Sequence, residues 1–307
     1  MNNAYILKKE RLKSFLKLLM KDFSLISPQL AKAGDFLLQE TEDLDRINLN
    51  YDITSNTLKE FFFPARETIF SYQKKEGSFK INPIQEKVPQ RVFFGLRSCD
   101  VRAVCFPDHF FSQEPQDALY WLKRTKNLLI SFACNRPPRR SCFCVYTKTG
   151  PFLEEGEGFD LQFIDFGRDY LVEIGTDKAG KFIKPYKRFF TLPDKSIEAR
   201  KDALEGKCLV EFQRKYDIMK VHEKLKNINL KDLWEELGKR CTNCGGCEFI
   251  CPTCFCFYHQ DIKFFDNNGE RIRAWDSCTF TGYGRMAGDV TPHEKNSDRV
   301  SRRFFCK

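Results

Sequence analysis

Long apolar stretches are absent from this chain of 307 residues. The apolar residues in positions 6–23 are interrupted by five lysines and one arginine, which is unlike the apolar centre of a signal peptide. No run approaches the roughly 18 apolar residues that a membrane helix needs. We therefore expect a cytoplasmic protein with no membrane insertion of its own, so that any contact with a membrane would go through a partner.

The residue patterns of several catalytic classes are also missing. Cys99, in Ser98-Cys99-Asp100, has no companion histidine at a recognisable spacing, so nucleophilic catalysis has little support. Gly156 and Gly158 lack the third glycine and the basic residue of phosphate-binding loops. The sequence predicts no catalytic residue and no nucleotide site. The four histidines show no ligand spacing among themselves; they are His109, His222, His259 and His293.

Basic residues outnumber acidic ones, 51 to 42, which gives a formal net charge of +9. The two signs are interleaved along the chain instead of forming a basic tract, which is typical of a solvated surface. We expect no binding of nucleic acid.

Cysteine, by contrast, is plentiful, with 14 residues. The chain is too long and its cysteines too clustered for a small secreted domain held by disulfides. Metal or redox chemistry is therefore the predicted use of these thiols.

The clearest motif covers residues 240–252, whose cysteines follow the ferredoxin spacing C-x2-C-x2-C-x3-C-P. Two glycines inside it would let the backbone pass close to the sulfurs of a cluster. We predict that Cys241, Cys244, Cys247 and Cys251 bind a 4Fe-4S cluster. Zinc is the alternative, but zinc modules usually separate two cysteine pairs by about a dozen residues or more.

The motif alone leaves open which ligands complete its site. In two-cluster ferredoxins the fourth cysteine of such a run ligates the other cluster, and no second complete motif is present. A partner's residue or a non-cysteine ligand could also contribute. The additional candidates within the chain are Cys254, Cys256, Cys278 and Cys306.

A second group of cysteines lies nearer the N-terminus, in loops or directly after apolar runs. If these loops meet at one end of a sheet, the thiolates could hold another metal cluster, and nearby arginines would lower the cost of their charge. The alternative is that they are ordinary buried residues. The group consists of Cys99, Cys134, Cys142 and Cys144, and the arginines are Arg97, Arg102, Arg136, Arg139 and Arg140.

The patterning predicts an α+β fold in two domains. We expect a mixed α/β domain over residues 1–238, followed by a small ferredoxin-like domain over 239–307 that is rich in helix and loop. Gly238 is a natural helix stop, which places the boundary. The expected elements are an amphipathic helix over 5–23, strands over 92–96 and 128–133, a hairpin over 159–173, a turn over 175–180, and helices over 195–238.

Together, these residues resemble the iron-sulfur protein family that includes sulfhydrogenase subunit beta and the corresponding iron-sulfur subunit of anaerobic sulfite reductase. The resemblance spans most of the chain. Its landmarks are residues 96–103, 141–144 with 149–151, 158–161, 240–256, 275–278, Gly282 and 285–288.

The resemblance implies a hetero-oligomeric subunit that passes electrons between a flavin-containing or ferredoxin partner and a catalytic hydrogenase or sulfite reductase subunit. It also favours a second site at the N-terminal group of cysteines. Two alternatives stay open: a reductase that acts directly on a sulfur substrate, and a structural metal-binding adaptor. Family members continue past the segment matching 302–305 into a second ferredoxin motif, whereas this sequence stops at Lys307, which leaves the number of clusters open.

Overall fold

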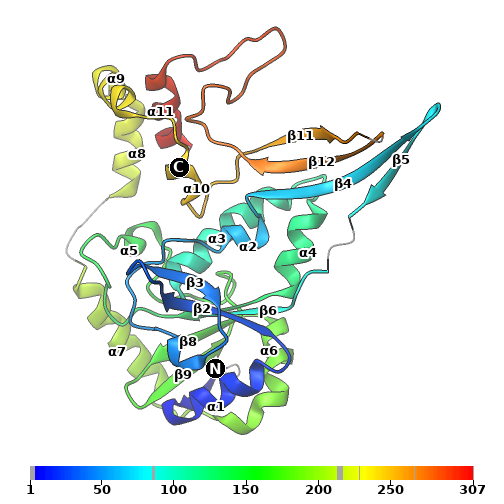
Figure 1. Ribbon diagram of the computed structural model, residues 1–307. Coiled ribbons are helices and arrows are strands. Elements are labelled where there is room, and N and C mark those ends of the chain that lie inside the picture. The colour runs from blue at the N-terminus through cyan, green and yellow to red at the C-terminus, as the bar shows by residue number, and fades with distance from the viewer. Residues whose placement is uncertain (1–3, 85–86, 213–216, 228, 266, 307) are drawn as a thin grey trace. The chain divides into compact units, whose positions relative to one another are not determined.

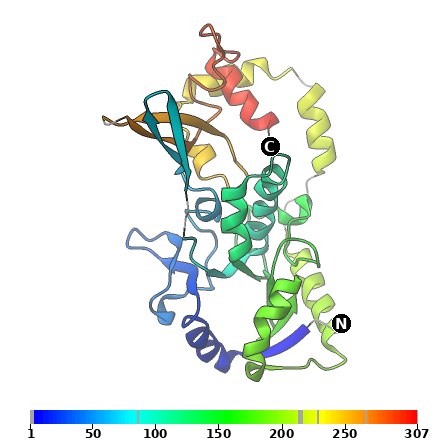
Figure 2. The same cartoon turned by 90° about the vertical axis from the view of Figure 1, so that its right-hand side faces the viewer.

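The computed structural model describes residues 4–84, 87–212, 217–227, 229–265 and 267–306. The chain divides into two compact units (Figures 1 and 2). The first unit consists of Met1–Leu58 and Val88–Ile218, and the second of Lys59–Lys87 and Met219–Lys307.

An eight-stranded mixed sheet forms the centre of the first unit. Its strands are β1 (Ala4–Lys8), β2 (Ser24–Leu30), β3 (Phe36–Glu40), β6 (Arg91–Arg97), β7 (Leu128–Phe132), β8 (Leu161–Asp165), β9 (Asp169–Ile174) and β10 (Phe190–Thr191). They lie in the order β10-β1-β9-β8-β7-β6-β2-β3. The four strands β2, β6, β7 and β8 are parallel, so their carboxyl ends share one edge of the sheet.

Buried apolar runs explain the central strands. All five residues of β7 and the inner residues of β6 are buried, as expected for parallel strands that are covered on both faces. The predictions of strands over 92–96 and 128–133 and of a hairpin over 159–173 are confirmed by β6, β7 and the antiparallel pair β8–β9.

Helices cover both faces of this sheet. On one face, α1 (Lys9–Leu19) and α6 (Asp177–Ile183) pack into the largest core cluster, and on the other α7 (Ile197–Val210) packs through Ile197 and Cys208. The remaining helical segments are the 3-10 turns η1 (Leu44–Arg46) and η2 (Lys184–Phe189), α3 (Ser98–Phe111), α4 (Ala118–Lys126) and α5 (Cys144–Thr147).

Two expectations for the first unit need correction. The helix predicted over 5–23 covers only Lys9–Leu19, because Ala4–Lys8 pairs with both β9 and β10 as strand β1. The turn predicted over 175–180 continues into α6, whose first turn is capped by the Thr176 hydroxyl accepting from the Ala179 amide.

The second unit combines a four-stranded antiparallel sheet with helices. The strands, in the order β11-β12-β4-β5, are β11 (Phe257–Lys263), β12 (Asn268–Trp275), β4 (Arg66–Lys75) and β5 (Ser78–Pro83). The helices are α2 (Lys59–Phe62), α8 (Ile218–Asn227, starting at the boundary), α9 (Lys231–Arg240), α10 (Gly246–Phe249) and α11 (Asn296–Phe305). The helical prediction over 195–238 is confirmed by α7, α8 and α9, but residues 195–196, 211–212, 217 and 229–230 between them are not helical, and residues 213–216 and 228 lie outside the described residues.

Two expectations for this part differ from the structure. Residues 59–87 lie with the C-terminal segment, because β4 pairs with β12, so the compact units do not follow a single cut at 238. Gly238 does not end α9; a Cβ there would lie 2.7 Å from the Ser297 amide nitrogen, so the glycine permits close packing against α11. Figures 1 and 2 both show α9 and α11 side by side.

The chain is thus a mixed α/β protein with a large mixed sheet, followed by a C-terminal region that carries the ferredoxin-like cysteines. The description of that region as helix and loop misses β11 and β12. Among the described residues, no helix has the length and apolar character needed to cross a bilayer.

Candidate functional site

The ferredoxin-like cysteines lie on and after a tight loop that joins α9 to α10: Cys241 and Cys244 lie on the loop, Cys247 lies in α10, and Cys251 follows that helix. The helix α9 ends at Arg240, and Cys241 follows it in extended conformation. Asn243 and Gly245 then adopt left-handed φ angles of 56° and 70°. A Cβ on Gly245 would lie 2.7 Å from the Phe280 ring, so this position requires glycine. The chain therefore turns sharply here and carries three thiols on a few residues.

Each of these thiols has a local polar partner. Cys247 Sγ donates to Glu248 Oε2 at 3.1 Å, and burial together with this carboxylate raises the pKa of Cys247 to about 11. The Gly246 amide donates to Cys244 and, with the Thr242 hydroxyl, lowers the pKa of that thiol. Backbone N–H groups aimed at sulfur in this way are typical of iron-sulfur loops.

The donor set fits an iron-sulfur cluster, because four thiols follow ferredoxin spacing and a backbone amide points at one of them. The side chains are not drawn together around one point. Across the described residues, no three of the histidine, cysteine, aspartate and glutamate side chains are placed to hold a metal ion. Ligation by Cys241, Cys244, Cys247 and Cys251 stays a prediction.

A buried carboxylate lies at the centre of this region. Glu248 is 1% exposed and accepts hydrogen bonds from four side chains. The donors are Cys247 Sγ at 3.1 Å, Ser277 Oγ at 2.8 Å, Cys278 Sγ at 3.2 Å and Arg303 Nη1 at 3.0 Å. Burial would raise the pKa of Glu248, but these hydrogen bonds outweigh it and the pKa is lowered. The carboxylate is therefore ionised at neutral pH and joins three segments.

Lys59 supports the same loop from the other segment of the second unit. Its ammonium donates to the Glu248 carbonyl oxygen at 3.0 Å and lies 3.9 Å from the centre of the Trp275 ring. The side chain is 4% exposed. The Trp275 indole N–H in turn donates to the Phe63 carbonyl oxygen at 2.9 Å. The start of the 59–87 segment is thus fixed against the cysteine loop.

The structure also places some of the additional cysteines. Cys278 is buried beside Glu248, and burial with this carboxylate raises the pKa of Cys278 to about 12. Cys256 and Cys306 are close enough to Cys278 to add to that rise. Cys254 is buried as well. Cys256, Cys278 and Cys306 therefore share a neighbourhood, and their role as ligands stays a prediction.

The cysteines of the first unit gather at the carboxyl ends of the parallel strands. Cys99 follows β6 at the start of α3, Cys134 follows β7, and Cys142 and Cys144 lie on the loop before and at the start of α5. Cys99 keeps an exposed surface, yet its pKa is raised. The main cause is burial of its other sides, and the nearby Asp100 and the three other thiols add to the rise. Burial, Cys134 and Cys142 raise the pKa of Cys144 to about 12.

The sequence does not single out Cys208, which also belongs here. Its Sγ donates to the Cys134 carbonyl oxygen at 2.9 Å, and burial with nearby Cys134 raises its pKa to about 12. No local sequence pattern indicates this contact, because Cys208 is 74 residues from Cys134 in sequence. The four predicted thiols are thus neighbours, and a metal cluster bound by them stays a prediction.

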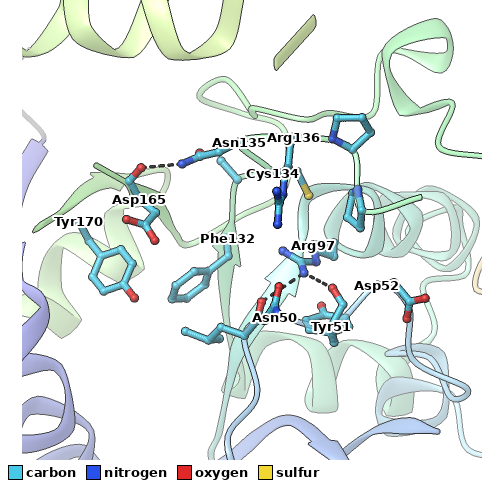
Figure 3. A pocket seen from close by; sticks show the side chains of 14 residues that line it. Asn50, Tyr51, Asp52, Arg97, Phe132, Cys134, Asn135, Arg136, Asp165 and Tyr170 are labelled. Atoms are coloured by element: carbon cyan, nitrogen blue, oxygen red, sulfur yellow. Dashed lines mark hydrogen bonds between the residues drawn. The ribbon is translucent and has the colours of Figure 1, made fainter. Parts of the chain in front are cut away.

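A hollow of about 510 Å³ opens beside Cys134 (Figure 3). The Arg97 guanidinium lies 4.3 Å from the Tyr51 ring centre and donates to the carbonyl oxygens of Leu49 and Tyr51. Burial raises the pKa of Cys134, and the Arg97 charge opposes the rise. In the described part of the chain, buried Arg97 Nε and Asn135 Oδ1 have no hydrogen-bond partner. This hollow can accept a polar or anionic group.

A second hollow, of about 350 Å³, lies beside Cys142. Arg139 and Arg140 line it, together with residues 210–212 at the C-terminal end of α7. The five arginines that the sequence places near these thiols are therefore not equivalent: Arg97 and Arg136 line the first hollow, Arg139 and Arg140 the second, and Arg102 pairs with Glu157 at 3.9 Å.

Comparison with known proteins gives two matches. Residues 240–307 match the 4Fe-4S dicluster domain. The chain is 25% identical to sulfhydrogenase 2 subunit beta of Pyrococcus furiosus over 278 residues, which are 89% of this chain and 78% of that protein. The chain is thus similar to sulfhydrogenase subunit beta, and its C-terminal part is similar to the 4Fe-4S dicluster domain. The predicted family resemblance is thereby confirmed. No solved structure matches this chain.

Proposed function

We propose that the chain is an iron-sulfur electron-transfer subunit of an anaerobic oxidoreductase complex. It would relay electrons between a flavin-containing or ferredoxin partner and a catalytic subunit of hydrogenase or sulfite reductase type, in a cytoplasmic hetero-oligomer. The observation that carries the proposal is the thiol loop of residues 241–251, built as a tight turn inside the segment that matches the 4Fe-4S dicluster domain.

In this proposal Cys241, Cys244, Cys247 and Cys251 hold a 4Fe-4S cluster, with Cys254, Cys256, Cys278 and Cys306 as candidates for further ligands. When bound, such a cluster supplies reversible one-electron storage. The surrounding residues fix its environment. The Gly246 amide stabilises negative charge on Cys244, whereas the Glu248 carboxylate disfavours added negative charge near Cys247.

A second cluster at Cys99, Cys134, Cys142 and Cys144 would extend the relay into the first unit. The support is their common neighbourhood at the carboxyl ends of parallel strands, where open α/β sheets commonly place their ligand sites. Arg97 would offset part of the thiolate charge.

The deciding experiment is the measurement of iron, acid-labile sulfide and zinc per chain after anaerobic purification. About four iron and four sulfide indicate one cluster, and about eight of each indicate a second. Each count is repeated on Cys244→Ala and Cys142→Ala, which should remove one cluster or the other. Zinc without sulfide would overturn the proposal.

A second candidate function is direct reduction of a sulfur substrate in the first unit. The observation that favours it is the hollow beside Cys134, with its unpartnered Arg97 and Asn135 atoms. The isolated chain would then oxidise dithionite-reduced viologen in the presence of sulfite, and Cys99→Ala or Cys142→Ala would abolish the activity. An inactive chain with intact clusters would leave electron transfer as its function.

A further inference from the structure

The hairpin of β4 and β5 presents one apolar face and one polar face. Directly opposed residues of an antiparallel pair point to the same side of the sheet. Tyr72 opposes Ile81 and Lys74 opposes Phe79, so their side chains share one side. We call the set Phe70, Tyr72, Phe79 and Ile81 the arm face. The other side carries Ser71, Gln73, Ser78, Lys80 and Asn82.

The arm face is exposed in the described chain. Phe79 is 65% exposed and Ile81 is 59% exposed. The four side chains, with Asp261 and Arg271, line a shallow hollow of about 250 Å³. Large side chains gathered on one side of an exposed hairpin, with polar residues on the other, are typical of a surface that another protein covers.

The hollow is held in shape by contacts within the second unit. The Tyr72 ring lies across Gly269, where a Cβ would come within 2.3 Å of it, and lies 6.3 Å from the Phe79 ring. Arg271 lies 5.4 Å from the Phe70 ring centre and is held by Asp261 through two hydrogen bonds of 2.7 Å. An aromatic surface with a fixed arginine has the composition of protein interfaces.

The charges around the arm face indicate what kind of partner fits. Lys74 lies on the same side as Tyr72, and Lys263, which opposes Gly269, completes the border. Neither lysine forms an ion pair with any described residue, whereas Asp261, the carboxylate that lines the hollow, is paired with Arg271. The border is therefore positive. Two copies of this chain meeting through the arm face would bring like charges together.

We propose that the arm face binds another protein subunit, whose contact surface has an apolar centre bordered by carboxylates. This inference rests on the proposed function in one respect, because an electron-transfer subunit needs a docked partner. It goes beyond that function by naming the surface and the charge of the partner. Phe79 and Ile81 would enter the partner's apolar centre, and Lys74 and Lys263 would pair with its acidic border.

The test places the photo-crosslinking residue p-benzoylphenylalanine in the full chain, produced in its own host. One variant carries it at Phe79 on the arm face, and the matched variant carries it at Lys80 on the other side of the same strand. We expect about tenfold more crosslinked product from position 79 than from position 80. The product should join this chain to a single different polypeptide, and the crosslinked peptide of that polypeptide should be acidic. The double variant Lys74→Glu with Lys263→Glu should reduce that yield about tenfold, and Lys80→Glu should not.

Three results would overturn the proposal: equal crosslinking from both positions, a product of twice the chain's own mass, or a yield that the double charge reversal leaves unchanged. Iron and sulfide are measured on the same variants. If the double variant Lys74→Glu with Lys263→Glu keeps a normal iron content but loses crosslinking, the result supports the docking surface. A chain without iron in every variant refutes electron transfer, while the comparison of positions 79 and 80 still decides the surface.

Discussion

At the scale of single residues, the ionised Glu248 is the group whose charge bears most directly on the thiol loop. Glu248→Gln removes a negative charge that contacts Cys247 and keeps the shape of the side chain. A cluster at this loop should then become easier to reduce, and its midpoint potential should rise by an amount on the order of tens of millivolts. The measurement is a redox titration followed by electron paramagnetic resonance.

Glu236→Gln is the matched control for that titration. Glu236 pairs with Arg240 just before the loop, but its side chain is 58% exposed, so water and salt screen its charge. The control should leave the potential unchanged. Equal shifts in both variants, or a potential that Glu248→Gln does not move, would contradict the role given to Glu248.

Gly245 gives a second prediction at this scale. Its φ of 70° and the nearby Phe280 ring both disfavour a side chain, so Gly245→Ala should lower iron content and cost about 1–3 kcal/mol of stability. Gly282→Ala is the control, because no atom lies within 4 Å of the added Cβ and its φ is not left-handed. Iron content is measured on both, and similar losses would show that the effect is not specific to the loop.

The cysteine loop could be predicted from sequence because its spacing is local. Glu248 lies inside the same motif, but its role could not be predicted. Its partners Ser277 and Arg303 lie 29 and 55 residues away, and nothing in a linear pattern links them. Cys208 was missed for the same reason, since only the packing of α7 brings it to Cys134.

At the scale of elements, the strands that could be predicted from the sequence are the buried ones. The inner residues of β6, all of β7 and most of β8 are buried, and their apolar runs are visible in the sequence. The residues of β11 are mostly exposed and polar, and this strand is held in the sheet by its antiparallel pairing with β12. Hydrophobic periodicity carries no signal for such a strand.

A buried ion pair joins two of these strands. Glu67 on β4 accepts from Arg273 Nε on β12 at 2.9 Å, and both side chains are less than a tenth exposed. Glu67→Gln removes a negative charge that contacts this buried guanidinium, so the second unit should lose about 3 kcal/mol of stability. Urea unfolding followed by tryptophan fluorescence in a Trp121→Phe background, where only Trp234 and Trp275 of the second unit remain, measures this change.

The control for that variant is Arg66→Gln on the same strand. Arg66 pairs with Glu270, but its side chain is 59% exposed, and the loss should stay within about 0.5 kcal/mol. If the two substitutions cost the same, the buried pair is not a principal link between β4 and β12.

At the scale of the whole molecule, the second unit depends on two distant segments. A fragment of residues 219–307 lacks β4 and β5, and the hairpin β11–β12 alone is too small for independent stability. We expect this fragment to take up little iron. Joining residues 59–87 to it through a glycine-serine linker should restore iron uptake, as measured by iron and sulfide per chain. If the fragment of residues 219–307 bound as much iron as the full chain, the second unit would not depend on residues 59–87.

The two-segment construction also determines when the second unit can form during protein synthesis. Residues 59–87 leave the ribosome early, whereas their strand partner β12 is made only after the whole first unit has been translated. Because domains generally fold as their segments emerge, β4 can pair at once with β5, but its other edge must wait for β12 while the first unit folds. The surroundings of the thiol loop are therefore completed only after the first unit has been translated, and assembly factors that deliver iron would encounter the finished loop no earlier than that.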